Sequence, residues 1–228
     1  QRPYDMRAVV RSLLDDGETL ELQPQFGRSL LTVLGRLGGE PVAVVANQPT
    51  FLAGSVDRDA ADKAARFLQL VDAFHLPVVF LADNPGILSG SKAERDGTLR
   101  AAARMFMAQS RLRVPKLHVT LRKAYGFGSS IMAMNPFDGQ TLSVAFPGIS
   151  LGGMPAAGGA EAAGLDAEGR RRMQEAQSSG AWSAADTLGY DEIIDPRELR
   201  NVLLAGLQTA LSRRAARAIP VAHTGIWP

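Results

Sequence analysis

The residues best suited to chemistry follow a short predicted strand that spans 116–121. The chain turns there through Gly126 and Gly128 and then enters small and apolar residues typical of a buried helix start. Glycine has no Cβ atom and lets the backbone approach another group closely. A turn that opens a helix also leaves several N–H groups unpaired at the positive end of the helix dipole. The N–H groups of Phe127 and Gly128 could therefore stabilise a developing enolate or ureido oxygen, as an oxyanion hole does.

An ordinary glycine turn before a buried helix would have the same local pattern, and that pattern alone favours this simpler interpretation. Two other turns support a functional role. Asn47 to Pro49, continued by Leu52 to Gly54, follows one predicted buried strand, and Asn84 to Gly86 follows another. Ligands of open α/β sheets bind beside the carboxyl ends of the strands. The three turns together therefore predict a site at that edge of the sheet.

The elements that position these turns follow from hydrophobic periodicity. Strands are predicted over 19–22, 30–37, 41–46, 78–82, 116–121, 142–146 and 190–194, with an edge strand or glycine-rich loop at 149–155. Helices are predicted over 3–14, 60–74, 98–111, 160–177 and from 195 to about 218, and the tail over 220–228 is expected to be irregular. Strands that alternate with helices of this length favour a largely parallel sheet with crossover helices. The sequence therefore predicts a single α/β domain.

The composition narrows the function classes. The 228 residues carry a formal net charge of +2 and 46% hydrophobic residues, which is typical of a globular protein and gives no argument for nucleic-acid binding. The chain has no cysteine, which excludes disulfides, thiolate zinc sites and a cysteine nucleophile, and fits a cytoplasmic location. Its apolar runs are too short to span a membrane.

Histidine and carboxylate side chains are less specific candidates. The three histidines, at positions 75, 118 and 223, have no second ligand at metal spacing, so no metal site is predicted. His118 alternates with apolar neighbours on a strand and is expected in the core. Four acidic residues lie near predicted turns: Asp83, Glu94, Asp96 and Asp138. A general base is conceivable among them, although such residues are more often solvated at the surface.

The chain also resembles one protein family along nearly its whole length. The segments that carry the resemblance are Pro3-Tyr-Asp-Met-Arg7, Val45-Ala-Asn-Gln-Pro49, Leu52-Ala-Gly54, Asp62-Lys-Ala-Ala-Arg-Phe67, Arg122-Lys-Ala-Tyr-Gly126 and Ile194-Asp-Pro-Arg-Glu198. They are similar to the carboxyltransferase β subunit of acyl-CoA carboxylases, of the propionyl-CoA carboxylase type. Members of that family carry two related crotonase-type lobes, and residues 1–228 resemble the C-terminal lobe only.

The resemblance implies a single lobe with the ββα spiral of the ClpP/crotonase fold. It also implies an enzyme that moves a carboxyl group from carboxybiotin, held on a carrier protein, to the α-carbon of a short acyl-CoA. The expected partners are an N-terminal carboxyltransferase lobe, a biotinylated carrier or biotin carboxylase subunit, and further copies of the chain in a trimer or hexamer. No metal, nucleic acid or membrane is expected to take part.

The family's backbone donor pair falls on Phe127 and Gly128, and Gly126 completes this catalytic turn. The family usually has Gly-Gly-Ala where this chain has Gly-Phe-Gly. Ser130 matches the position whose side chain tunes acyl length in the family. The residues implied to contact substrate or biotin are Ala53, Gly54, Asn84, Pro85, Gly86, Ile87, Tyr125, Ser129 and Ser130.

Two departures from the family pattern motivate alternatives. Phe127 introduces a bulky phenyl ring, and in the loop after Gly86 only Gly90, Glu94 and Gly97 align. One alternative is a non-catalytic crotonase-fold scaffold or binding module. Another is a different crotonase-type acyl-CoA enzyme, such as a decarboxylase or hydrolase that uses a side-chain base.

Overall fold

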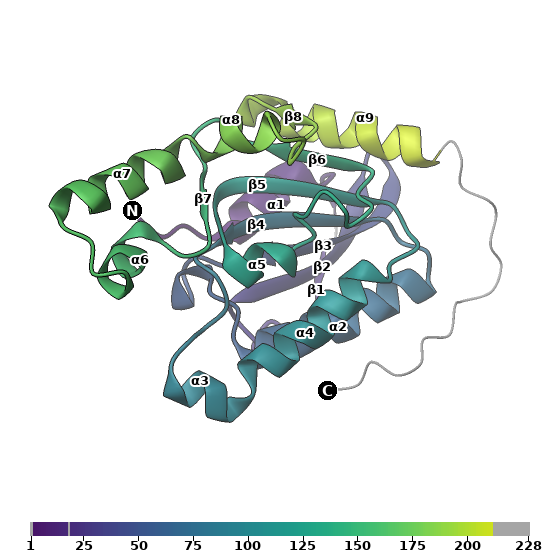
Figure 1. Cartoon of the computed structure of the whole chain (residues 1–228). Coiled ribbons are helices and arrows are strands. Elements are labelled where there is room, and N and C mark those ends of the chain that lie inside the picture. Colours follow the sequence, from purple (N-terminus) through teal and green to yellow (C-terminus); the bar gives the residue numbers. More distant parts are fainter. Residues whose placement is uncertain (1, 18, 212–228) are drawn as a thin grey trace.

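The computed structural model describes residues 2–17 and 19–211, which fold around an eight-stranded sheet (Figure 1). The strands are β1 Leu20–Glu21, β2 Leu30–Leu37, β3 Glu40–Asn47, β4 Val78–Asn84, β5 Lys116–Tyr125, β6 Leu142–Ala145, β7 Ser150–Gly152 and β8 Glu192–Ile193. Their order is β1-β2-β3-β4-β5-β6-β8, and β7 pairs with the far end of β5. The first two pairings are antiparallel and all later ones are parallel. The predicted α/β class is confirmed.

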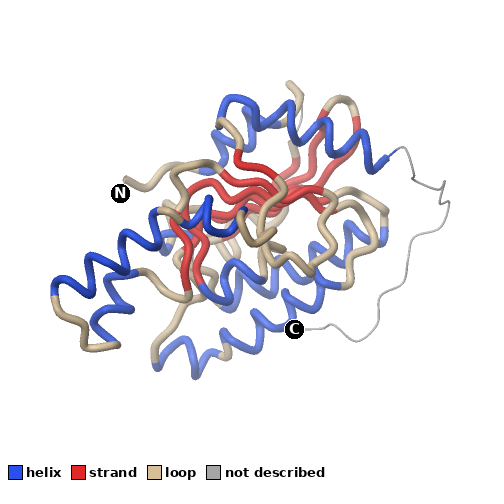
Figure 2. The backbone as a smooth tube through the Cα atoms, turned by 45° about the horizontal axis from the view of Figure 1, so that its top comes forward, coloured by secondary structure: helices blue, strands red, loops and turns tan. Residues whose placement is uncertain are grey.

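Helices cover both faces of this sheet, as Figure 2 shows. The α-helices are α1 Met6–Leu13, α2 Arg58–Ala73, α3 Ser91–Asp96, α4 Thr98–Ser110, α5 Gly126–Ser130, α6 Ala156–Ala162, α7 Ala167–Ser178, α8 Gly180–Ala185 and α9 Leu199–Leu211. Two short 3-10 helices, η1 Leu52–Gly54 and η2 Pro196–Glu198, interrupt the connections. In both views the pair α6 and α7 extends beyond the sheet. Within the described ranges, no helix is long and apolar enough to cross a membrane.

Two hydrophobic clusters lie on opposite faces of the sheet, and β4 contributes to both. Val78, Phe80 and Ala82 pack with α2 and α4, whereas Val79 and Leu81 pack with α1 and α9. All seven residues of β4 are buried. A strand covered on both faces must be apolar at consecutive positions rather than at alternate ones. This is why the continuous apolar runs predicted the central strands well.

The C-terminal third differs from the prediction. The single helix expected over 160–177 is wrong, because α6 ends at Ala162 and α7 begins at Ala167. Gly164 adopts a positive φ of 62°, and the Asp166 side chain accepts a hydrogen bond from the Gly169 N–H and caps α7. The last helix is described to Leu211, so its expected end near 218, the tail over 220–228 and His223 lie outside the described residues.

The strand before the glycine turn is longer than predicted. β5 continues to Tyr125 because β7 pairs with its carboxyl end, with Lys123 opposite Ser150 and Tyr125 opposite Gly152. The helix that follows, α5, has only five residues. The turn at Gly126 therefore begins directly after a paired strand end rather than in a free loop.

Candidate functional site

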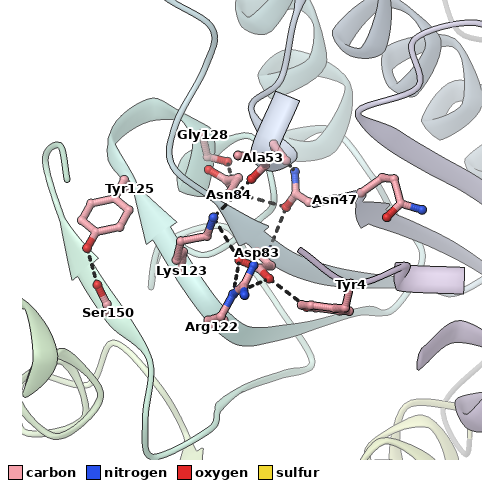
Figure 3. A network of polar contacts seen from close by, with 12 residues as sticks. Tyr4, Asn47, Ala53, Asp83, Asn84, Arg122, Lys123, Tyr125, Gly128 and Ser150 are labelled. Atoms are coloured by element: carbon pink, nitrogen blue, oxygen red, sulfur yellow. Dashed lines mark hydrogen bonds and ion pairs between the residues drawn. The ribbon is translucent and has the colours of Figure 1, made fainter. Parts of the chain in front are cut away.

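The turn after β3 is bonded directly to the end of β4. Asn47, the last residue of β3, accepts hydrogen bonds at Oδ1 from the Asp83 N–H at 3.0 Å and from the Asn84 amide at 3.1 Å. Its Nδ2 donates to the carbonyl oxygen of Gly54 at 3.2 Å. Gly54 approaches β4 so closely that a Cβ atom there would stand 2.4 Å from the Asp83 carbonyl oxygen. The first two predicted turns thus form one bonded unit, shown around Asn47 in Figure 3.

The third turn packs against the same unit. A Cβ atom at Gly128 would stand 2.3 Å from Asn84 Oδ1 and 2.6 Å from Gly86 Cα. Asn84 Oδ1 accepts from the Gly86 N–H at 3.0 Å, and its Nδ2 donates to the Gly128 carbonyl at 3.4 Å. The predicted convergence of three turns at one sheet edge is confirmed. Glycine at position 128 is required by this close approach.

Several main-chain N–H groups of the described residues are left unpaired where these turns meet. Within residues 2–17 and 19–211, no oxygen accepts a hydrogen bond from the N–H of Ala53, Phe127 or Gly128. Leu52 and Ala53 have positive φ angles of 49° and 53°, a conformation that costs roughly 1–2 kcal/mol for residues with a side chain. Strained backbone of this kind clusters at ligand-binding sites. The site therefore offers backbone N–H groups that can bind an oxygen carrying negative charge.

Asp83 is the buried charge beneath this edge, and the expectation that it lies at the surface is wrong. Its carboxylate is fully buried, forms an ion pair with Arg122 at 2.9 Å and lies 3.7 Å from Lys123 Nζ. The Tyr4 hydroxyl donates to Asp83 Oδ2 at 2.8 Å. Burial, together with the neighbouring carboxylate, raises the pKa of Tyr4 well above its usual value. Asp138 is also buried, whereas Glu94 and Asp96 are exposed as expected.

Lys123 connects the charged cluster to the first turn. Its Nζ donates to the carbonyl oxygen of Ala53 at 3.2 Å while its ammonium faces Asp83 (Figure 3). Burial lowers the pKa of Lys123, and Asp83 opposes that shift. Lys123 is not among the residues that the resemblance implies, but it follows the predicted strand over 116–121, and a charged residue just after a buried strand is the signal that could have identified it. Asn47 belongs to a predicted turn, although its bonds to β4 were not predicted.

We expect Asp83→Asn to lower the free energy of unfolding by about 2 kcal/mol, the contribution of hydrogen bonds to a charged group. The neutral amide would leave Arg122 and Lys123 without the buried counter-charge that they face. Urea denaturation measures the change. Asp96→Asn is the control, because Asp96 pairs with Lys92 on an exposed helix and should leave the transition nearly unchanged. Equal stability of the Asp83 variant and the parent would contradict the role of this ion pair.

Some implied residues point away from the meeting point of the turns. The Phe127 ring lies 5.7 Å from the Phe106 ring, centroid to centroid, and packs with the cluster of α2 and α4. The Ile87 side chain packs in the same cluster. The Ser130 hydroxyl donates to Asn135 Oδ1 at 3.3 Å, and the Ser129 hydroxyl donates to the Gly126 carbonyl at 2.6 Å. The two apolar side chains therefore pack in the core cluster, and the two serine hydroxyls form local hydrogen bonds in or just after the turn.

His118 holds the turn after α5 on the sheet, and its predicted place in the core is confirmed. Its Nδ1 lies 2.8 Å from the Met132 carbonyl and therefore donates, so its Nε2 accepts from the Thr120 hydroxyl at 2.8 Å. Thr120 in turn accepts from the Tyr190 hydroxyl at 2.7 Å. The imidazole is neutral in this arrangement, and burial lowers the pKa of His118 to about 4.

We expect the stability of the fold to decrease between pH 7 and pH 5 because of His118. Below about pH 6.5 the unfolded chain binds a proton at this imidazole, whereas the folded chain does so only near pH 4. The contribution is about 2 kcal/mol between pH 7 and pH 5. Urea denaturation at both pH values should show a smaller decrease in His118→Gln, where no imidazole remains. An equal decrease in the parent and the variant would contradict this assignment.

A polar cavity of about 380 Å³ lies beside η1 and was not predicted from the sequence. Arg7, Glu21, Arg28 and Phe51 are among the residues that line it. Arg7 pairs with Glu21 through two hydrogen bonds of 2.7 Å, and the Arg28 guanidinium lies 4.7 Å from the centre of the Phe51 ring. Phe51 directly precedes η1, so the cavity adjoins the first of the three turns.

Comparison with known proteins identifies the chain. The carboxyl transferase domain family matches residues 1–224. The chain belongs to this family. Its resemblance to acyl-CoA carboxylase carboxyltransferase subunits, inferred from the sequence, is thereby confirmed. It is 37% identical to the propionyl-CoA carboxylase beta chain of Saccharopolyspora erythraea over 100% of its own length and 44% of that protein. It is 35% identical to the methylmalonyl-CoA decarboxylase subunit alpha of Veillonella parvula, with 98% of its own length and 44% of that protein covered.

The fold of this carboxyl transferase domain also matches solved structures over the whole of this chain and less than half of theirs. A structure of the transcarboxylase 12S hexamer, with methylmalonyl-coenzyme A and methylmalonic acid bound, superimposes with a TM-score of 0.88 at 34% identity. The match covers 100% of this chain and 45% of that one. The chain thus spans less than half the length of these relatives. The predicted crotonase-type fold is confirmed.

Proposed function

We propose that residues 1–228 form the C-terminal lobe of a biotin-dependent acyl-CoA carboxyltransferase. The observation that carries the proposal is the set of unpaired N–H groups at Phe127 and Gly128, at an edge where three turns converge. Membership in the carboxyl transferase domain family supports it, and relatives of this chain are named biotin-dependent carboxylase subunits. In this proposal the lobe works with an N-terminal lobe, a biotinylated carrier and further copies of the chain in a trimer or hexamer.

The donor chemistry of the turn fits the ureido group of biotin. A ureido oxygen gains negative charge when the carboxyl group leaves the adjacent nitrogen, and paired N–H donors stabilise such an oxygen. Gly86, Gly126 and Gly128 place no side chain in this corner. At Gly126 and Gly128 a side chain would not fit, because neighbouring atoms already occupy the Cβ position. The chain therefore offers backbone donors and close main-chain approach, as the reaction requires.

Carboxybiotin would supply the carboxyl group, and this chain would supply positioning and charge stabilisation. Phe127 and Gly128 would donate hydrogen bonds to the enolate or ureido oxygen as its negative charge develops. Ala53 would add a third donor from the opposite turn, which Lys123 and Asn47 hold through the carbonyls of Ala53 and Gly54. No side-chain nucleophile is needed in this scheme. The α-proton of the acyl-CoA would pass to the biotin nitrogen that gives up the carboxyl group, so the new C–C bond replaces the C–H bond and the N–C bond that break. The chain's own contribution would be electrostatic stabilisation and orientation.

The direct test is an assay of carboxyl transfer. The chain is combined with its N-terminal lobe, and short acyl-CoAs are supplied with a carboxylated biotin carrier, or free biotin and a carboxylated acyl-CoA are supplied for the reverse direction. We expect transfer that depends on both lobes. A well-folded complex that transfers nothing with any acyl-CoA would support the alternative of a non-catalytic scaffold or binding module.

A second candidate is decarboxylation of a carboxylated acyl-CoA, with the carboxyl group passing to biotin. It is favoured by the 35% identity to a methylmalonyl-CoA decarboxylase subunit. The same site would serve, since the two reactions are opposite directions of one transfer. The assay would be run with a biotin carrier that is continually returned to its uncarboxylated form. Loss of the carboxyl group from the carboxylated acyl-CoA, with no carboxylation of the plain acyl-CoA, would select this candidate.

A further inference from the structure

Tyr125 connects the donor turn to the α6–α7 arm, the segment of residues 156–178 that extends beyond the sheet. Tyr125 is the last residue of β5 and is buried. Its hydroxyl donates to Gln177 Oε1 at 3.0 Å and is in hydrogen-bond contact with the Ser150 hydroxyl. A phenol has one proton, so the Ser150 hydroxyl donates to Tyr125. Figure 3 shows this contact at the side of the site opposite Tyr4.

Gln177 satisfies three groups at once. Its Oε1 also accepts from the Ala156 N–H at 3.0 Å, and its Nε2 donates to the Met154 carbonyl at 2.9 Å. The backbone N–H of Ala156 fixes which end of the amide is oxygen. The side chain therefore joins α7 to the start of α6 and to Tyr125 at the same time.

Apart from α6 and the following α8, α7 lies against the short edge strand β7. Every residue of α7 is at least partly exposed. Its half-buried residues are Gly169, Met173 and Gln177, one turn apart. Gly169 faces Leu165 and Met173 faces Gly159, both within the arm. Gln177 is the one of the three that reaches a residue of β5.

The segment between β7 and α6 lies directly against the donor turn. Gly126 has a positive φ of 53°, and a Cβ atom there would stand 2.5 Å from the Gly153 carbonyl oxygen. Gly153 precedes Met154, whose carbonyl Gln177 holds. A displacement of residues 153–156 would therefore move the backbone of Gly126 and, with it, the N–H groups that follow.

We propose that Gln177 is a positioning residue for carboxyl transfer. It holds the α6–α7 arm against Tyr125 and so couples the placement of the arm to the alignment of the Phe127 and Gly128 N–H groups. The catalytic consequence rests on the proposed function, whereas the mechanical coupling does not. Gln177 acts through Tyr125 and the 153–156 segment and makes no contact with the reacting atoms in this scheme.

Gln177→Met tests the proposal, because methionine has a similar length and removes all three hydrogen bonds. Tyr125→Phe removes the hydroxyl from the other side, and Gln174→Met, at an exposed position of the same helix, is the matched control. Hydrogen exchange reports on α5 through the amides of Ile131 and Met132, which donate to the carbonyls of Phe127 and Ser129. We expect exchange to accelerate about tenfold in Gln177→Met and in Tyr125→Phe, the size of one lost hydrogen bond, and to stay unchanged in the control.

The kinetic measurement separates positioning from general destabilisation. In the complex with the N-terminal lobe, kcat should decrease about tenfold in Gln177→Met while KM for the acyl-CoA changes little. The double variant should lose no more than either single variant, because both remove the same connection. Unchanged exchange at Ile131 and Met132 in both single variants, or additive losses in the double variant, would overturn the proposal. If the parent complex transfers no carboxyl group, the proposed function fails, and the exchange data still decide the coupling.

Discussion

Replacing Gly128 with alanine is expected to reduce kcat/KM for carboxyl transfer at least about 100-fold. The new methyl group would stand 2.3 Å from Asn84 Oδ1 and 2.6 Å from the Cα atom of Gly86, which is backbone and cannot rotate away. α5 would have to shift by several tenths of an ångström or more, and its N–H groups would leave the position set by the three turns. A displacement of about 1 Å in a positioned group costs on the order of 100-fold in rate.

The matched control is Gly148→Ala. A Cβ atom at Gly148 would meet nothing within 4 Å. This variant therefore adds the same methyl group as Gly128→Ala but does not contact the site. Both variants should be compared by urea denaturation as well as by activity, so that a loss of folded protein is not counted as a loss of rate. If Gly128→Ala retained the activity of the control while folded, the close approach at α5 would have no catalytic meaning.

The central sheet could be predicted from the sequence because each strand is marked by local chemistry. Val42 to Ala46 and Val78 to Ala82 are apolar at consecutive positions, and both faces of these strands are covered. The glycines at 126 and 128 indicated close backbone approach, and the structure places neighbouring atoms within 2.5 Å of the Cβ position at each. In these cases the residue type alone indicates the structure: consecutive apolar residues indicate a strand covered on both faces, and glycine at a corner indicates close backbone contact.

The features that escaped prediction depend on partners far apart in the chain. Asp83 was expected in solvent because its sequence neighbours form a turn, yet Tyr4 and Arg122 reach it from 79 and 39 positions away. Gln177 carries no local sign of its role, since its partner Tyr125 lies 52 positions away. The break between α6 and α7 required the positive φ of Gly164, which a glycine permits but does not demand. Pairings of this kind follow from the tertiary fold and not from periodicity.

Phe127 lies in the predicted donor turn, but its ring does not occupy the space that the sequence suggested. The sequence suggested that its phenyl group would crowd the donor turn. In the structure the ring packs beside Phe106 within the core cluster, and only the backbone of Phe127 faces the meeting point of the turns. The substitution of Phe in the usual Gly-Gly-Ala pattern is therefore compatible with a backbone donor at this position.

Removing only the N–H of Phe127 is expected to lower kcat strongly with very little change in structure. Incorporating phenyllactic acid at position 127 converts the Gly126–Phe127 amide to an ester, so the N–H is lost while the ring keeps its contact with Phe106. Loss of one oxyanion donor costs about 100- to 1,000-fold in kcat. Phenyllactic acid at Phe137, whose side chain is 78% exposed, makes the same change of atoms in a turn outside the three that form the site.

This ester substitution, measured as kcat for carboxyl transfer in the complex with the N-terminal lobe, tests the account most directly. The account predicts a decrease of about 100-fold or more at position 127, with unchanged folding and near-parental activity for the ester at position 137. A kcat at position 127 within twofold of the parent value would contradict the claim that this main-chain N–H stabilises the charge that develops during transfer.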